Sequence, residues 1–201
     1  MRPRLTILLY TLLVAPTAGA AYAAAGDPAA IQVQALGSSL LEAMKAGTSV
    51  STAQRYRRLE PVIEQVFALP LMTRLSVGPS WTSFQPQQQS ALVAAFSRYT
   101  IANYAHNFHD YKGQKFDVDE NVVDRGEEKI VRSRLESPND TPVNFLYRMR
   151  EVNGVWKIVD VYFNGVSQLI LHRTEFSEAI ASGGPPALIA HLNEVSDGLM
   201  K

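Results

Sequence analysis

Trp156-Lys-Ile-Val-Asp-Val-Tyr-Phe-Asn-Gly-Val-Ser-Gln-Leu-Ile-Leu-His-Arg-Thr-Glu-Phe176 is the stretch of sequence that decides the fold. Its first part is rich in β-branched and aromatic residues, which favour a strand over 155–163. Asn164-Gly165 is typical of a tight turn. Leu169, Ile170 and Phe176 then recur at helical spacing, and we therefore predict a helix that starts near Val166.

The strand before this stretch is joined to it by Asn153-Gly154, a strong signal for a two-residue hairpin loop. If these two residues form the whole loop, Tyr147 faces Asp160 and Phe145 faces Tyr162. Two earlier strands are expected over 115–122 and 129–135, which gives a curved four-stranded antiparallel meander. Apolar side chains fall on both faces of the last hairpin, so each face needs cover, or a ligand on one of them.

Helical patterns lie on both sides of the predicted sheet. Asp27-Pro28 reads as a cap followed by proline in the first turn, and Gly47 as the end of that helix. A second helix from Thr52 should break or kink at Pro61. The longest should run from about residue 86 to 110, and the last should stop and restart at 183–186. The order predicts an α+β domain with N-terminal and C-terminal helices packed on the sheet.

Residues 1–25 have the three parts of a secretory signal peptide: Arg2 and Arg4, a short apolar segment over 5–14, and small residues before position 26. We expect export with cleavage, the alternative being an uncleaved membrane anchor. Residues 26–201 then form one domain. The chain has no cysteine, which excludes disulfides and thiolate chemistry. Its 19 basic and 19 acidic residues balance, so no global field favours nucleic acid.

Few side chains have a pattern typical of catalysis or metal binding. His106, His109 and Asp110 have metal-like spacing, but we interpret them as a solvated helix end and expect no metal site. Ser167 does not match a nucleophile elbow and should bond local backbone at a helix start. Asp160 lies in an apolar strand and needs a partner, for which Tyr147 and Arg173 are candidates.

The pattern W-x-I-x-D-V-x-x-x-G-V-S followed by R-x-x-F, over 156–176, resembles the C-terminal half of the MlaC (toluene-tolerance) family of periplasmic phospholipid-binding proteins. The last third, including Ser182-Gly-Gly-Pro-x-Ala-Leu-Ile189, is most similar to the hopanoid biosynthesis-associated branch of the family, HpnM. General phospholipid carriers of the family have an asparagine-tyrosine-arginine triplet where this chain has Leu171-His172-Arg173, and only the arginine is kept.

This resemblance implies a periplasmic lipid carrier, a monomer that holds a phospholipid or hopanoid in an apolar cavity and works with membrane-bound ABC-type lipid-transport complexes. It implies no enzyme activity, no cofactor and no nucleic acid. Asp160 and Arg173 are expected to be structural polar residues. The cavity should open near 69–75. Its lipid-binding residues are expected to be Phe67, Leu71, Met72, Leu75, Phe96, Tyr99, Tyr104, Phe145, Tyr147, Met149, Val161 and Val166.

Two other functions fit the residues. Asp160 could be the base of a small isomerase or dehydratase, which requires it at a pocket floor with a second polar group in reach. Alternatively, the chain could be an interaction subunit, which predicts an exposed apolar patch instead of an enclosed cavity.

Overall fold

The structure, a computed structural model, describes residues 26–138 and 140–201. The predicted signal peptide, 1–25, lies outside the described residues. Within them the chain forms helices and one antiparallel sheet, so the predicted mixed class is confirmed. The helices are α1 (Pro28–Ala46), α2 (Thr52–Val66), α3 (Leu69–Val77), α4 (Pro86–Asn107) and α5 (Gln168–Leu199), with short 3₁₀ turns at Gly47–Ser49 and Gly78–Ser83.

The sheet has six strands where the sequence predicted four. They are β1 (Lys115–Val118), β2 (Val123–Arg125), β3 (Glu128–Ser137), β4 (Asp140–Val152), β5 (Val155–Phe163) and β6 (Val166–Ser167). The strand order is β1-β3-β4-β5-β6, and β2 also pairs with β3. The expected first strand is therefore split into β1 and β2, and the turn at Asn164-Gly165 adds the short β6.

The predicted register of the β4–β5 hairpin holds only near the turn. Glu151 pairs with Trp156 and Met149 with Ile158, but Arg148 then pairs with Asp160. Val159 is therefore an extra residue on β5, a β-bulge. Beyond it every partner moves by one, so Tyr147 faces Val161 instead of Asp160.

Local sequence signals determine most helix boundaries. The Asp27 side chain caps α1 by accepting a hydrogen bond from the Ala29 N–H, at 2.8 Å. Ser51 and Gln54 form a capping box at the start of α2. Of the break or kink expected at Pro61, the break is wrong, because α2 continues through it to Val66. Pro61 is solvent-exposed, so water can hydrogen-bond the carbonyl that its missing N–H leaves free.

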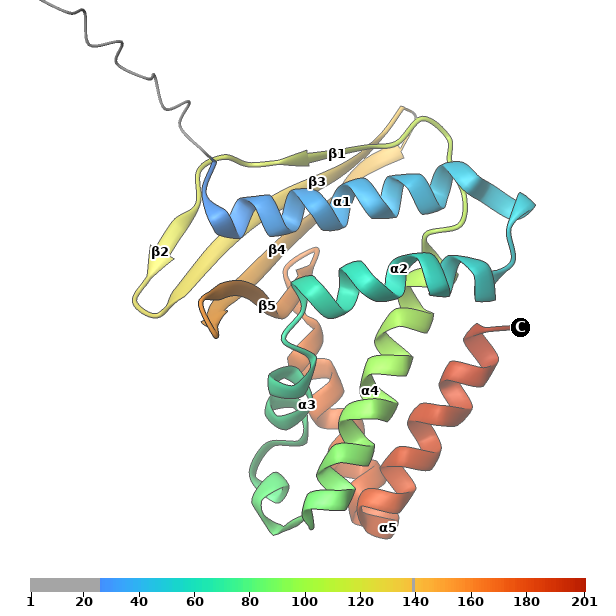
Figure 1. The fold of residues 1–201 in the computed structure, drawn as a ribbon, viewed down its shortest axis with the longest axis vertical. Helices are drawn as coiled ribbons and strands as arrows, with labels where there is room; N and C mark the ends of the chain where they lie inside the picture. Colours follow the sequence, from blue (N-terminus) through green and yellow to red (C-terminus); the bar gives the residue numbers. More distant parts are fainter. Residues whose placement is uncertain (1–25, 139) are drawn as a thin grey trace, which may run out of the picture.

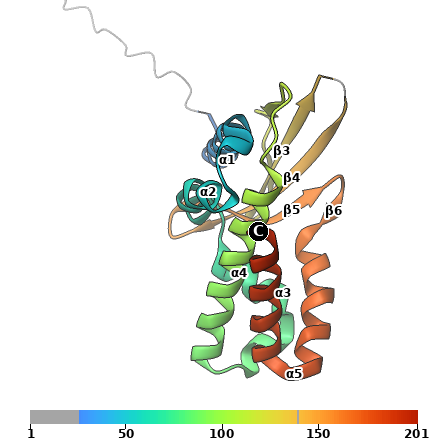
Figure 2. The same ribbon diagram turned by 90° about the vertical axis from the view of Figure 1, so that its right-hand side faces the viewer.

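The predicted interruption near residue 183 is confirmed. Gly183 and Gly184 have non-helical dihedrals inside α5, and φ of Gly184 is +68°, a left-handed conformation that favours glycine. The segments 168–182 and 185–199 therefore fold back on each other as a helical hairpin, which Figure 2 shows as the orange and red helices. A hydrogen bond of 2.6 Å between Glu175 and His191 joins the two segments.

A buried arginine holds the corner between α1 and α2. Arg55 is 5 % exposed and donates hydrogen bonds to the carbonyl oxygens of Ala105, Gly47 and Val50, at 2.8, 3.1 and 2.7 Å. It also donates to the Thr52 hydroxyl at 3.1 Å. Because Ala105 belongs to α4, these bonds fix the N-terminal helices against α4.

The helices cover one face of the sheet and extend beyond it. α1 lies across the strands and contacts β1, β3 and β5, while α3, α4 and α5 pack together at one end, as Figure 1 shows. The opposite face of β3 exposes Arg132 and Arg134, whereas Val131 and Ser133 are buried. Among the described residues, no helix has the length and apolar character needed to span a bilayer.

Candidate functional site

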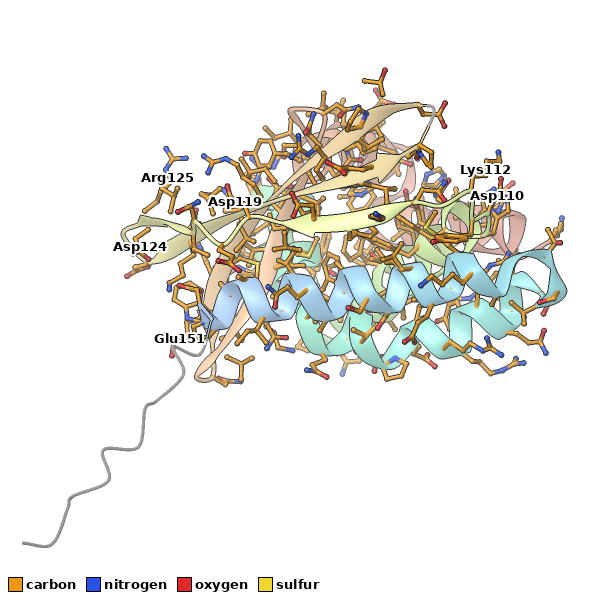
Figure 3. The ribbon with its side chains drawn as sticks, turned by 90° about the horizontal axis from the view of Figure 1, so that it is seen from above. Asp110, Lys112, Asp119, Asp124, Arg125 and Glu151 are labelled. Atoms are coloured by element: carbon orange, nitrogen blue, oxygen red, sulfur yellow. The ribbon has the colours of Figure 1, made fainter. Side chains whose placement is uncertain are left out.

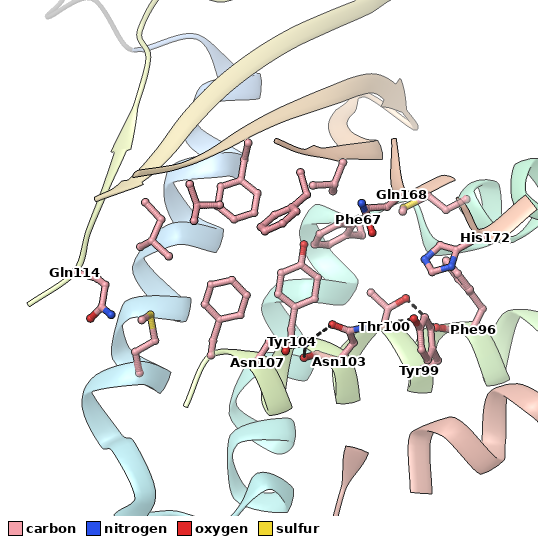
Figure 4. A pocket seen from close by; sticks show the side chains of 18 of the residues that line it. Phe67, Phe96, Tyr99, Thr100, Asn103, Tyr104, Asn107, Gln114, Gln168 and His172 are labelled. Carbon is pink, nitrogen blue, oxygen red and sulfur yellow. Dashed lines mark hydrogen bonds between the residues drawn. The ribbon is translucent and has the colours of Figure 1, made fainter. Parts of the chain in front are cut away.

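A cavity of about 560 Å³ lies between the covered face of the sheet and the helices. This volume is within the range of ligand pockets of about 300–1,000 Å³. Figure 4 shows the cavity with α4 below it and the strands above. The residues that line it are Met44, Phe67, Met72, Phe96, Tyr99, Thr100, Asn103, Tyr104, Asn107, Phe108, Asp110, Gln114, Leu135, Val143, Phe145, Val161, Phe163, Gln168 and His172.

Two rows of residues on α4, the first of them extended by the C-cap residue Phe108, form the floor of the cavity. Side chains four positions apart lie on the same helix face, so 96, 100, 104 and 108 form one row and 99, 103 and 107 the other. The first row is mainly aromatic. Its Tyr104 ring centroid lies 5.6 Å from that of Phe67 and 5.6 Å from that of Phe108. The floor therefore has an apolar row beside a polar one.

The sequence-predicted lipid-binding residues divide into two groups. Phe67, Met72, Phe96, Tyr99, Tyr104, Phe145 and Val161 line the cavity. The other five do not. Leu71 and Leu75 are half-buried on α3, Val166 is exposed, and Tyr147 and Met149 are buried in the core. The expected opening near 69–75 is represented in the lining by Met72 alone.

Apart from Tyr99, the polar part of the lining was missed by the sequence reasoning. Asn107 donates to the Asn103 side-chain oxygen at 2.7 Å, and Asn103 donates to the Tyr99 hydroxyl at 3.4 Å. Thr100 donates to the Phe96 carbonyl oxygen at 2.9 Å. Thr100 and Asn103 follow the predicted Phe96 and Tyr99 by four residues, and Asn107 follows Tyr99 by eight. This helical spacing is the signal that could have found them.

Asp160 lies outside the cavity. It is 2 % exposed, and its carboxyl group accepts hydrogen bonds from the Ser167 hydroxyl at 2.7 Å and the Leu169 N–H at 3.1 Å. Neither predicted partner contacts it. The bulge moves Tyr147 away, and Arg173 instead donates to the Leu75 carbonyl oxygen at 2.8 Å. Ser167 also caps α5 by accepting from the Ile170 N–H, so Asp160 fixes the junction between β6 and α5.

A carboxylate between two histidines lies behind the His172 wall of the cavity. Glu175 is 3.6 Å from the Nδ1 atom of His172 and 2.6 Å from the Nε2 atom of His191. The close approach of His172 lowers the pKa of Glu175 to about 2, with a further contribution from His191 and partial opposition from burial. Glu175 therefore carries a negative charge throughout the neutral range.

Replacing Glu175 with Gln should reduce acid stability within a defined pH window. The folded-state pKa of about 2 is below the ordinary value of 4.5, so the contribution of Glu175 is present above pH 4.5 and disappears as the pH falls toward 2. The Glu175 side chain is 45 % exposed, so we expect at most about 1 kcal/mol. Urea unfolding from pH 7 to 2 should show wild type and variant converge at the acid end. A difference that is constant with pH would contradict this.

The histidines near the end of α4 contact backbone. The Nδ1 atom of His106 lies 3.1 Å from the Leu199 carbonyl oxygen, and that of His109 lies 2.6 Å from the His106 carbonyl oxygen. In the part of the chain that the structure describes, no three His, Asp or Glu side chains come together in a group that could hold a metal ion.

Comparison with known proteins identifies the family of the chain. The sequence model of the MlaC protein family matches residues 34–194, which is most of the chain. The chain belongs to the MlaC family. Among curated proteins, this MlaC-family chain is 25 % identical over 99 residues to the toluene tolerance protein ttg2D of Pseudomonas putida. That match covers 49 % of the chain and 46 % of the relative, so it spans about half the length of each protein.

A solved structure shares the MlaC-family fold. The phospholipid-binding protein of Ralstonia solanacearum, determined in complex with a phospholipid, superposes with a TM-score of 0.75. The match covers 86 % of this chain and 99 % of the other, at 21 % sequence identity. At that level of identity, the likeness shows that the two chains have the same arrangement of helices and sheet.

Proposed function

We propose that this member of the MlaC family is a periplasmic lipid carrier. The observation that carries the proposal is the cavity of about 560 Å³ with walls of aromatic and aliphatic side chains from the sheet and α4. Apolar surface in water costs about 25 cal/mol per Å². A cavity with such walls removes the acyl chains or ring system of a lipid from water, and needs no reactive group to do so. The lipid is a phospholipid or a hopanoid, and the latter would place the chain in the HpnM branch.

The same proposal includes export and membrane partners. Residues 1–25 supply the predicted export signal, and an ABC-type inner-membrane lipid-transport complex is the proposed partner. Four exposed apolar residues follow one another along the end of β5, β6 and the first turn of α5: Phe163, Val166, Ile170 and Leu171. Phe163 also lines the cavity. Exposed apolar side chains next to a ligand site are typical of a contact surface, so delivery to a partner fits this end of the molecule.

Native mass spectrometry of the purified protein, followed by extraction and identification of its lipid, tests the proposal. A bound phospholipid or hopanoid at one molecule per chain is expected, and its loss on denaturation should restore the mass of the polypeptide. The apo protein should also take up lipid from vesicles and release it to acceptor vesicles. A protein that purifies without lipid and takes up none would refute the carrier function.

A further inference from the structure

The cavity extends along α4. This helix and its C-cap contribute lining residues from Phe96 to Phe108, and Figure 4 shows Gln114 and His172 at opposite ends of the space. At about 1.5 Å per residue, the helix advances about 18 Å between positions 96 and 108. One extended hydrocarbon chain can therefore lie along the floor, with one end near Gln114 and the other at His172.

Aromatic side chains close the end of the cavity at His172. The ring of His172 is stacked on that of Phe176, with centroids 5.4 Å apart. It also lies edge-on to the rings of Phe96 and Tyr99, at 5.7 and 5.5 Å. Phe176 and Phe96 are 0 % and 1 % exposed, so the space ends here and not in solvent. The Nδ1 atom of His172 faces Glu175 at 3.6 Å. Contacts on several sides thus hold the His172 ring as an end wall.

The exposed residues of the lining belong to the ends of α4 and β5. They are Asn107, Asp110 and Phe163. Figure 3 shows Asp110 beside Lys112 at one end of the molecule, where the two form an ion pair of 2.8 Å. Water reaches the cavity at these positions. Because a phosphate-bearing head group stays hydrated, a phospholipid chain along α4 would leave its head group outside and place its methyl end at His172.

We infer that the cavity limits the length of the acyl chain that it accepts, and that His172 sets the limit. A fully extended backbone advances about 3.3–3.6 Å for every three bonds, and an extended acyl chain has similar bond lengths and angles. A floor of about 18 Å therefore holds about 15 bonds, which is a chain of about 16 carbons. The inference rests on the proposed function, because it specifies which phospholipids the same cavity carries.

The selection arises because a bilayer and the cavity both remove methylene groups from water. Each methylene of a chain that fits moves from one apolar environment to another, so retention should not depend on chain length below the limit. A methylene beyond the limit is displaced into water at the exposed end, which lowers retention about fourfold per group. Two additional carbons should therefore lower retention about tenfold or more.

Competition among phosphatidylcholines of different chain length tests this limit. Dilauroyl, dimyristoyl, dipalmitoyl and distearoyl phosphatidylcholine lengthen by two carbons at each step, and both chains of each lipid are the same. Small, equal amounts of all four are mixed into fluid vesicles of dioleoyl phosphatidylcholine. The purified protein is incubated with the vesicles and separated from them, and its lipids are extracted and quantified. We expect equal retention of the first three lipids and about tenfold or more lower retention of the distearoyl lipid.

Thr100→Met should shorten the cavity from its closed end. Thr100 is 8 % exposed and lies one turn from Phe96 on the floor, so a longer side chain there enters empty space. One turn is about 5.4 Å, or about four carbons. Retention of the dipalmitoyl lipid should therefore fall about tenfold or more relative to the dilauroyl lipid.

Ser90→Met is the matched control for this variant. Ser90 lies on the same helix but is exposed and outside the lining. Its hydroxyl donates to the Pro86 carbonyl oxygen, as that of Thr100 donates to the Phe96 carbonyl oxygen, so both substitutions remove the same kind of bond. Ser90→Met should retain all four lipids as wild type does.

His172→Ala removes the end wall itself. The space gained lies against the ring of Phe176, while Glu175 keeps its hydrogen bond of 2.6 Å to His191. Retention of the distearoyl lipid should rise to that of the dipalmitoyl lipid. Urea unfolding establishes that each variant is folded before its lipids are compared. If His172→Ala does not fold, the wild-type series and Thr100→Met still decide.

The outcomes distinguish this inference from the function on which it rests. Equal retention of the four lipids by wild type, a Thr100→Met variant that loses all four alike, or a folded His172→Ala variant that still excludes the distearoyl lipid would overturn the length limit. Each would leave the carrier function in place, as would a protein that binds a hopanoid and no phospholipid. Retention of no lipid at all would overturn both.

Discussion

Replacing Val161 with Trp is expected to leave the purified protein with at least about tenfold less bound lipid, a change of about 1.4 kcal/mol or more in binding free energy. Val161 is 6 % exposed and lines the cavity from β5, the strand opposite the floor formed by α4. The larger indole ring would occupy space that the lipid needs. Because that space is empty of protein atoms, the ring should be accommodated without the strain of overpacking a filled core.

Val155→Trp is the matched control for this prediction. Val155 lies on the same strand next to the Asn153-Gly154 turn, is 40 % exposed and does not line the cavity. Both variants should unfold at similar urea concentrations, and Val155→Trp should retain lipid as wild type does. Lipid extraction from equal amounts of the three proteins provides the measurement. Undiminished lipid in Val161→Trp would mean that the cavity is not where lipid binds.

Replacing Asp160 with Ala should destabilise the protein by about 3 kcal/mol. The change leaves the Ser167 hydroxyl and the Leu169 N–H as buried donors without their acceptor, and each unpaired group costs about 1–3 kcal/mol. Asp160→Asn should cost less because its side-chain oxygen can still accept from Leu169. Ser167→Ala should also cost less, since it leaves Leu169 paired. Urea unfolding followed by circular dichroism gives all three values.

The same series decides between a structural and a catalytic Asp160. A general base at a pocket floor would be removable at little cost in stability, because its partner would be a substrate. The structural role predicts the order Asp160→Ala, then Asp160→Asn and Ser167→Ala, in loss of stability. It also predicts normal lipid content in whatever protein folds. An Asp160→Ala variant as stable as wild type would contradict the structural role.

Sequence reasoning succeeded where the deciding interactions are local. The cap at Asp27, the end at Gly47 and the interruption at 183–184 depend on neighbouring residues, and all three are present. It failed where distant segments decide. The bulge at Val159 depends on how β5 fits β4 and the helices, so counting from Asn153-Gly154 gave the wrong partners for Asp160. The break expected at Pro61 is absent because a helix can accommodate an interior proline on a solvent-exposed face, and the fold decides which face is exposed.

For the candidate site too, sequence reasoning succeeded for local patterns and failed where distant segments decide. Aromatic residues with helical spacing indicated the α4 side of the cavity. By contrast, Tyr147 and Met149 could not be separated from cavity residues by sequence, because a buried wall and a solid core use the same side chains. The two asparagines of the polar row were missed because Asn103 and Asn107 resemble ordinary surface residues in sequence. Only the fold places them beside an apolar space.

The extra residue in β5, Val159, changes which residues of that strand face the helices and the cavity. On β4 the odd positions 145, 147 and 149 are buried, and before the bulge the even position 158 faces them. After Val159 the inward set becomes odd, so Val161 and Phe163 reach the cavity, while Asp160 lies outside it. Deleting Val159 would turn the second half of β5 over, so that the Asp160 carboxyl group would face the cavity in place of Val161. One backbone irregularity thus keeps the acid of this strand out of the apolar space.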